Sequence, residues 1–216
     1  MLTALIVILI IAACGGSAGS NTDCPSGAIV AFGDSITYGA GIPREDSYPS
    51  QLANRIQQHV CNAGINGDRV EDGLDRLQRD VLSHRPAAVV ILLGANDVGL
   101  FGFPTEPAQF SKSLSSIVER IRSSGAEPLL CSLLPIDAQL LKSSLLQPER
   151  WSEYDNLVRA VAVDKAVPLV DLATAIDGRL DLLLDGLHPT AAGSTVIAEA
   201  VAGALISEGL ATPVTG

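Results

Sequence analysis

Five short runs of apolar residues recur along the chain, and each is nearly continuous instead of alternating with polar positions. Runs of this length predict β-strands, and their unbroken apolar character predicts that both faces of the sheet are covered. The expected strands are Ala28–Phe32, Val60–Ala63, Ala87–Leu93, Pro128–Leu134 and Val167–Leu172.

Segments with helical spacing lie between these strands. Asp68–His84, for example, places Val70, Leu74, Leu77 and Val81 three and four residues apart, which gives one apolar stripe. The other expected helices are Tyr48–His59, Pro107–Ser124, Pro148–Lys165 and Thr190–Ser207. This alternation predicts a three-layer α/β/α sandwich around a five-stranded parallel sheet, in one domain.

The first residues follow a different pattern. Leu2–Ile11 is apolar except for Thr3, too short to span a bilayer and of the length found in secretory signal peptides. The following Ala12-Ala13-Cys14 and a Gly/Ser-rich stretch resemble a bacterial lipobox. We therefore expect a signal peptide at 1–13, a lipidated Cys14 with a flexible tether at 14–26, the folded domain at 27–210 and a C-terminal tail at 211–216.

This interpretation makes the protein an exported lipoprotein anchored to the bacterial cell envelope. No Lys or Arg precedes the apolar run, whereas signal peptides usually carry positive charge there. An ordinary signal peptide and a buried N-terminal helix are the alternatives.

The charge balance narrows the possible partners. The 216 residues include 14 Lys and Arg against 24 Asp and Glu, for a net charge of -10. Binding to nucleic acid requires clustered basic residues, and no such cluster appears, so we expect no nucleic-acid partner. Membrane attachment would then come from the lipid on Cys14 and not from a basic surface.

Three cysteines remain beside Cys14. An exported protein can pair two of them, and Cys24 with Cys61 is the first pair to test. Cys61 and Cys131 also lie in strand-like runs, where a cysteine typically serves as a small core residue. No Cys or His spacing indicates a zinc site.

In a parallel α/β sheet, ligands bind beyond the carboxyl ends of the strands. Four polar segments fall there: Gly33-Asp34-Ser35, Gly64 with the residues after it, Gly94-Ala95-Asn96-Asp97 and Asp185-Gly186-Leu187-His188.

A serine at such a strand end can act as a nucleophile if a base is near. His59 and His84 fall at the ends of expected helices, where the helix dipole explains them. His188 instead lies in a loop and follows Asp185 by three residues, the arrangement in which a carboxylate orients an imidazole. A helix cap with a surface imidazole is the alternative for that pair.

Acyl transfer also requires hydrogen-bond donors aimed at the developing oxyanion. The N–H groups of Ser35 and Gly64 and the side-chain amide of Asn96 are the candidates. Each also has an ordinary explanation as a turn residue.

Taken together and in this order, the four segments resemble the motif blocks of the SGNH hydrolases, the GDSL esterase/lipase superfamily. The resemblance implies a flavodoxin-like fold and no metal or cofactor. It implies Ser35 as nucleophile, His188 as base, Asp185 as its orienting acid, and an oxyanion hole from Ser35, Gly64 and Asn96. Asp34 and Asp97 are expected to hold the two active-site turns.

Finer similarity joins the chain to the bacterial arylesterase, acyl-CoA thioesterase and lysophospholipase group. It rests on segments such as Glu45–Pro49, Asn62–Asp68 and Gly125–Leu130. The group's activity implies a small acyl ester, thioester or lipid as substrate. Two alternatives are a carbohydrate O-deacetylase of the same fold and a non-catalytic binding module.

The residues after Asn96 bear on the substrate. Leu100, Phe101 and Phe103 are apolar and are expected to line an acyl-binding groove. The alternative is that they pin the loop to the core.

Overall fold

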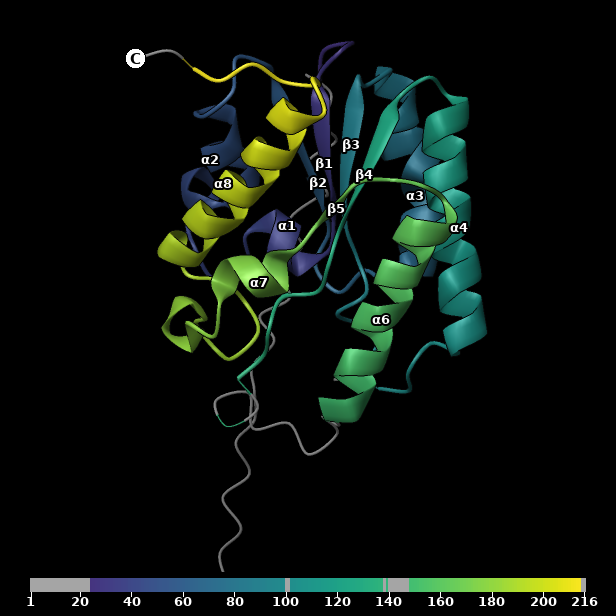
Figure 1. Ribbon diagram of the computed structural model, residues 1–216, viewed down its shortest axis with the longest axis vertical. Coiled ribbons are helices and arrows are strands. Elements are labelled where there is room, and N and C mark those ends of the chain that lie inside the picture. Colours follow the sequence, from purple (N-terminus) through teal and green to yellow (C-terminus); the bar gives the residue numbers. More distant parts are fainter. Residues whose placement is uncertain (1–23, 100–101, 138, 140–147, 215–216) are drawn as a thin grey trace, which may run out of the picture.

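The computed structural model describes residues 24–99, 102–137, 139 and 148–214. Five parallel strands form one sheet in the order β2-β1-β3-β4-β5 (Figure 1). They are β1 (Ile29–Gly33), β2 (Val60–Gly64), β3 (Ala88–Leu92), β4 (Glu127–Cys131) and β5 (Leu169–Val170). The predicted parallel sheet is confirmed, and its order is that of flavodoxin-like proteins.

Helices cover both faces of the sheet. On one side, α2 (Tyr48–Ala53) packs against α8 (Ala191–Ser207), which also contacts α7 (Leu172–Ile176). On the other side, α4 (Pro107–Ser123) packs between α3 (Val70–Asp80) and α6 (Pro148–Asp164). The predicted three-layer sandwich is therefore correct.

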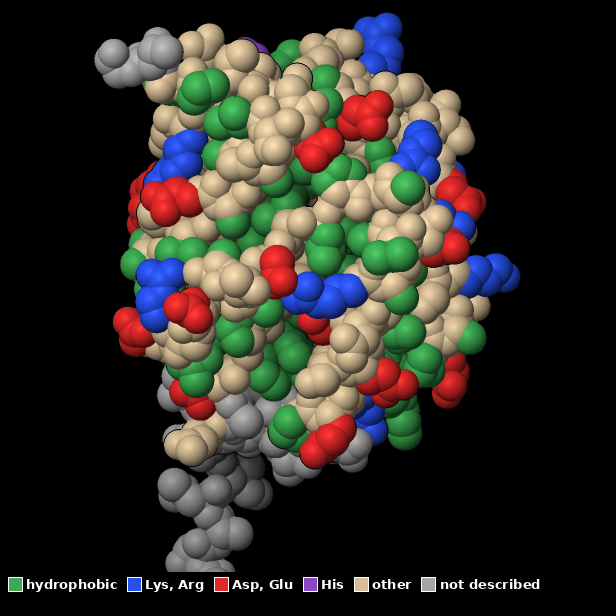
Figure 2. All heavy atoms as spheres, in the orientation of Figure 1, with side chains coloured by type: hydrophobic (Ala, Val, Ile, Leu, Met, Phe, Trp, Pro, Cys, Tyr) green, Lys and Arg blue, Asp and Glu red, His purple; other side chains and the backbone are tan. Residues whose placement is uncertain are grey.

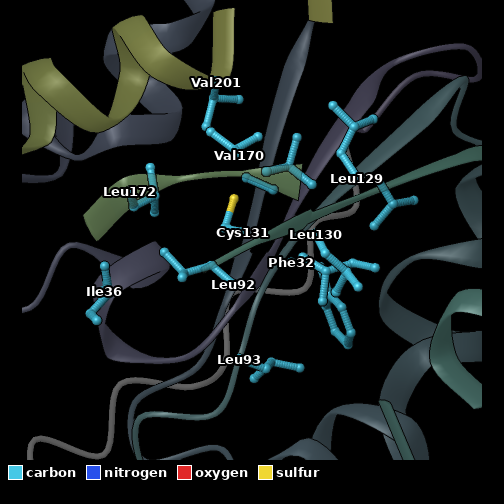
Figure 3. Close-up of a cluster of buried hydrophobic side chains, with 14 of the residues drawn as sticks. Phe32, Ile36, Leu92, Leu93, Leu129, Leu130, Cys131, Val170, Leu172 and Val201 are labelled. Atoms are coloured by element: carbon cyan, nitrogen blue, oxygen red, sulfur yellow. The ribbon is translucent and has the colours of Figure 1, made fainter. Parts of the chain in front are cut away.

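The two central strands carry the core. Every residue of β1 and β3 is buried, as continuous apolar runs require, whereas β2 at the sheet edge alternates between buried and half-buried positions. Figure 3 shows side chains from the strands meeting helical residues, among them Ile36, Leu172 and Val201. Within the described ranges, no helix combines the length and apolar character needed to cross a bilayer.

One expected helix is much shorter than its pattern suggested. The segment Tyr48–His59 is helical only to Ala53. Beyond it, Ile56 forms an antiparallel bridge with Pro213, and the Gln57 N–H donates to the Thr212 carbonyl. This pairing replaces helical hydrogen bonds, so the prediction of His59 at a helix end is wrong. Thr212, Pro213 and Val214, expected in a C-terminal tail, make this pairing.

Two short helices were not expected at all. Helix α1 (Ser35–Tyr38) and helix α7 begin directly after β1 and β5, each capped by an aspartate side chain, Asp34 and Asp171. Four or five residues are too few to show a helical period. In the sequence, the available signal for these two helices is the aspartate at each N-cap position.

A disulfide joins Cys24 to Cys61 in β2 and leaves Cys131 as a free, buried thiol. The pairing of Cys24 with Cys61, the first to test from the sequence, is therefore confirmed. The bridge attaches the start of the described chain to the sheet edge, within the segment expected to be a tether.

Reducing the Cys24–Cys61 bond should lower the free energy of unfolding by about 4 kcal/mol, because the bridge closes a loop between residues separated by 37 positions. Urea unfolding with and without a reductant measures this loss. Cys131→Ala should keep the response to reductant, and the Cys24→Ser/Cys61→Ser double variant should lose it. A double variant that still responds would contradict the assignment.

Candidate active site

Ser35 is presented by a tight turn from β1 into α1. A Cβ on Gly33 would lie 2.2 Å from Thr37 Oγ1 and 2.4 Å from the Leu92 carbonyl oxygen, so only glycine fits there. The buried Asp34 side chain then caps α1, accepting from the Ile36 N–H at 2.9 Å. Ser35 is thereby held half-buried at the first position of the helix.

The structure brings His188 to Ser35 across 153 residues of sequence. The His188 Nε2 and Ser35 Oγ atoms are 2.9 Å apart. On the other side of the ring, His188 Nδ1 lies 2.8 Å from Asp185 Oδ2. With the Nδ1 proton donated to Asp185, Nε2 is left as the acceptor for the serine hydroxyl, the tautomer that a general base needs.

Backbone hydrogen bonds fix the Asp185–His188 turn. Asp185 Oδ1 accepts from the N–H groups of Leu187 and His188, at 3.0 and 2.8 Å. The Leu184 N–H closes the turn by donating to the His188 carbonyl at 2.7 Å. Burial alone would raise the pKa of Asp185, but the hydrogen bonds and charge of His188 outweigh it and hold that pKa below its usual value. The carboxylate therefore stays ionised beside the imidazole.

Asn96 lies at the end of β3, half-buried and facing the same edge of the sheet. One Nδ2 proton donates to the Asp68 carbonyl at 2.9 Å, while the Asp34 Oδ2 atom is 3.5 Å from the same nitrogen. The second contact is at the limit of a hydrogen bond and is weak, so a ligand can displace it and accept that proton. The Ser35 N–H has no partner among the residues described.

Gly64 does not offer the donor expected of it. Its N–H donates to Asn62 Oδ1 at 2.9 Å. A Cβ there would lie 2.2 Å from the Tyr38 nitrogen, so this glycine is required for close packing of β2 on α1. Three residues on, the Gly67 N–H has no partner within the described part of the chain, and this glycine has open space around it at φ +83°. The dipeptide Asn66-Gly67 is typical of a turn, and this pattern could have indicated Gly67 as a candidate donor.

Asp34 and Asp97 hold the active-site turns, as expected. Asp97 accepts from Thr105 Oγ1 at 2.6 Å and from the Val70 N–H at 3.1 Å, which ties the β3 turn to the start of α3. Burial raises the pKa of Asp34 to about 7 and that of Asp97 to about 6.

Sequence reasoning missed Arg76. This residue of α3 is buried, and its guanidinium reaches the carboxyl ends of β1 and β2. In the sequence, the one sign that Arg76 is buried is its position beside Leu77, in a helix with a single apolar stripe.

The apolar segment after Asn96 is only partly described. Leu100 and Phe101 lie outside the described residues, as does Cys14. The Phe103 side chain is 89% exposed, and its carbonyl accepts from Arg69 at 2.8 Å. Phe103 is therefore not packed into the core, which removes the pinning alternative for this residue. No cluster of three or more His, Cys, Asp or Glu suited to a metal occurs in the described segments.

The model of the GDSL-like lipase/acylhydrolase family matches residues 31–196, a span that contains Ser35, Asn96, Asp185 and His188. The chain belongs to this family. Its SGNH resemblance is thereby confirmed, and the protein is a carboxylic ester hydrolase.

This GDSL hydrolase is similar to an esterase, a lipoprotein and a lipase/acylhydrolase of known structure. An arylesterase from Vibrio mimicus is 33% identical, over 82% of this chain and 88% of its own. An uncharacterised lipoprotein, YqeF of Bacillus subtilis, is 31% identical over 66% and 69%. The crystal structure of a lipase/acylhydrolase from Enterococcus faecalis superposes with a TM-score of 0.74 at 28% identity, covering 88% of this chain and all of that one.

Asp34 should make stability fall as the pH rises. Its ordinary pKa of 3.8 becomes about 7 in the folded state, so between these values the folded protein holds a proton that the unfolded chain has released. Asp34→Asn removes this titration and keeps an acceptor for the Ile36 N–H. Urea unfolding at about pH 5 and about pH 7 should show a smaller drop in the variant than in the wild type. Asp97 titrates in both proteins, so the comparison isolates Asp34 together with its repulsion from Asp97. Equal drops would contradict the buried, protonated state of Asp34.

Proposed function

We propose that the protein hydrolyses carboxylic acyl esters or thioesters through an acyl-enzyme formed on Ser35. The observation that carries the proposal is the continuous chain from Ser35 Oγ to His188 Nε2 at 2.9 Å and from His188 Nδ1 to Asp185 Oδ2 at 2.8 Å. Side chains from two segments far apart in the sequence meet in the order that nucleophilic catalysis requires.

In the first half of the reaction, the Ser35 oxygen attacks the carbonyl carbon while His188 Nε2 takes its proton. The carbonyl electron pair moves onto oxygen and gives a tetrahedral intermediate. When the intermediate collapses, the bond to the leaving oxygen or sulfur breaks, and His188 gives the proton to that atom. Asp185 remains ionised and stabilises the imidazolium.

Water completes the cycle by the same route. His188 removes a proton from the water as its oxygen attacks the acyl-enzyme. The second tetrahedral intermediate releases the acid, and the proton returns to Ser35 Oγ. No redox partner is required, because both steps are displacements at the acyl carbon.

Three donors stabilise the oxyanion in this proposal: the Ser35 N–H, the Asn96 side-chain amide and the Gly67 N–H. Gly67 takes the place expected for Gly64, whose N–H is bonded to Asn62. Gly67 precedes Asp68, the residue whose carbonyl accepts from Asn96, so the two donors belong to adjoining turns.

The favoured substrates are esters that carry an apolar acyl or aryl group. Phe103 presents an exposed aromatic ring on the loop that begins at Asn96. Its carbonyl is held by Arg69, the neighbour of Asp68, which keeps this part of the loop beside the proposed oxyanion site. The name of the Vibrio relative, an arylesterase, supports the same class of substrate.

We further propose that lipid on Cys14 anchors the exported domain to the cell envelope. The lipobox-like sequence at residues 11–14 motivates this, and the similarity to a Bacillus lipoprotein supports it. The Cys24–Cys61 bond suits an oxidising compartment outside the cytoplasm. Figure 2 shows acidic and basic side chains interspersed on the visible face, with no basic patch there to bind lipid headgroups.

Ser35→Ala should abolish the hydrolysis of p-nitrophenyl acetate and prevent covalent labelling by a fluorophosphonate. The melting temperature should change little, because Ser35 is half-buried and the one hydrogen bond of its Oγ atom to a described side chain is that with His188. Labelling is followed by the mass of the intact protein. A labelled or active Ser35→Ala protein would sink the nucleophile assignment, and a wild type that never labels would favour a binding module.

Phe103→Ala should lower kcat/KM for long-chain p-nitrophenyl esters about tenfold, the worth of about 1.4 kcal/mol of apolar contact. Hydrolysis of p-nitrophenyl acetate should fall much less, since it shares the p-nitrophenyl group with the longer esters but has no long acyl chain to pack against the ring. Val163→Ala is the matched control, because Val163 is 82% exposed but lies on α6. A preference for an acetylated sugar over all of these esters would instead identify an O-deacetylase.

A further inference from the structure

Arg76 is a buried cation whose hydrogen bonds converge on the carboxyl edge of the sheet. Its side chain is only 6% exposed. The guanidinium donates to the Gly33 carbonyl at the end of β1 and to the Ala63 carbonyl near the end of β2, each at 2.9 Å. It also donates to Asp68 Oδ2 at 2.5 Å.

Close packing of α3 on the sheet makes this reach possible. A Cβ on Gly73 would lie 2.8 Å from Leu93 Cδ1 and 3.3 Å from the Phe32 ring, so a larger residue there would require the Leu93 side chain to move. One turn further on, the Arg76 guanidinium lies 4.5 Å from the centre of the Phe32 ring. The ring and the Asp68 carboxylate together compensate the buried charge.

Each of the three acceptors leads directly to a proposed oxyanion donor. Gly33 is two residues before Ser35, so the Gly33 carbonyl fixes the start of the turn that orients the Ser35 N–H. Ala63 precedes the turn that contains Gly67. Asp68 is held by its carboxylate from Arg76 and, through its carbonyl, accepts from the Asn96 amide.

We propose that Arg76 is a positioning residue that sets the geometry of the oxyanion hole, by fixing together the three turns that supply its donors. It touches neither the substrate nor the reacting atoms. The inference rests on the proposed function, because it requires an oxyanion held by Ser35, Gly67 and Asn96.

A planar fork is what this position requires. Three acceptors on three segments are reached by different nitrogens of one rigid group, and a lysine ammonium cannot reproduce that arrangement. A purely structural ion pair would stabilise the fold without affecting the transition state more than the bound substrate. The two roles therefore differ in how kcat and KM respond.

Arg76→Lys keeps the charge and loses the fork. With p-nitrophenyl acetate, we expect kcat to fall between about tenfold and about a hundredfold while KM changes less than about twofold, because misplaced donors weaken transition-state binding. Arg159→Lys is the matched control, since Arg159 also bridges two carboxylates, Asp155 and Asp171, but contacts none of the three turns. It should lower the melting temperature without a comparable loss of kcat.

A double-mutant cycle with Asn96→Ala separates positioning from general damage. Asn96→Ala alone should lower kcat on the order of a hundredfold or more. In that background Arg76→Lys should cost clearly less than it does in the wild type, because one of the donors it positions is already gone. Fully additive losses, an unchanged kcat for Arg76→Lys, or an equal loss of kcat in Arg159→Lys would overturn the inference.

Asp68→Asn covers the case in which Arg76→Lys does not fold. It weakens the link to Arg76 and leaves the Asp68 carbonyl for Asn96, so kcat should fall with KM retained; an unchanged kcat in a folded Asp68→Asn protein would overturn the inference. The proposed function fails separately, if Asn96→Ala keeps full activity or Ser35→Ala still hydrolyses the ester.

Discussion

The register of three parallel strands determines where everything else lies. Gly33 in β1 is paired with Gly64 in β2 and with Leu92 in β3, so the three strands end at one level. The turns that follow them therefore begin side by side, although they are far apart in sequence. A shift of one residue in β1 would turn the buried side chains of that strand to the opposite face and move Ser35 away from Asn96.

Polar groups must be buried at this edge if the turns are to be held still. Asp34, Asp97 and Arg76 are all buried and hydrogen-bonded, Asp34 within its own turn and the other two to neighbouring segments. Unpaired groups of this kind would each cost about 1–3 kcal/mol, so the network is stable only when complete. That requirement links catalysis to folding: the hydrogen bonds that fix the turns also satisfy the polar groups that are buried there.

Much of this could be predicted from residue order. Continuous apolar runs indicated the sheet, and polar segments at strand ends indicated which of them would meet, including Ser35, Asp185 and His188. Periodicity failed for Tyr48–His59, because pairing with Pro213 and its neighbours is a long-range contact that no local pattern encodes. The hydrogen bond that occupies the Gly64 N–H could not be predicted, for a related reason. Which of two nearby N–H groups is free depends on the Asn62 side chain, and its position is set by packing.

Arg76 shows most clearly what could not be predicted from the sequence. A charged residue in an amphipathic helix usually lies on the solvent face, and only the depth of α3 against Phe32 and Leu93 reveals that this one points inward. The residues that perform chemistry stand in recognisable motifs, whereas the residue that holds the motifs together does not.

The most direct test of the account is a crystal structure of the protein after reaction with a fluorophosphonate, which leaves a tetrahedral phosphorus on the nucleophile. The account predicts phosphorus on Ser35 Oγ, with one of its oxygens accepting hydrogen bonds from the Ser35 N–H, the Asn96 amide and the Gly67 N–H, while the Gly64 N–H stays bonded to Asn62. Phosphorus on another residue, or an oxygen held by the Gly64 N–H instead of Gly67, would contradict it.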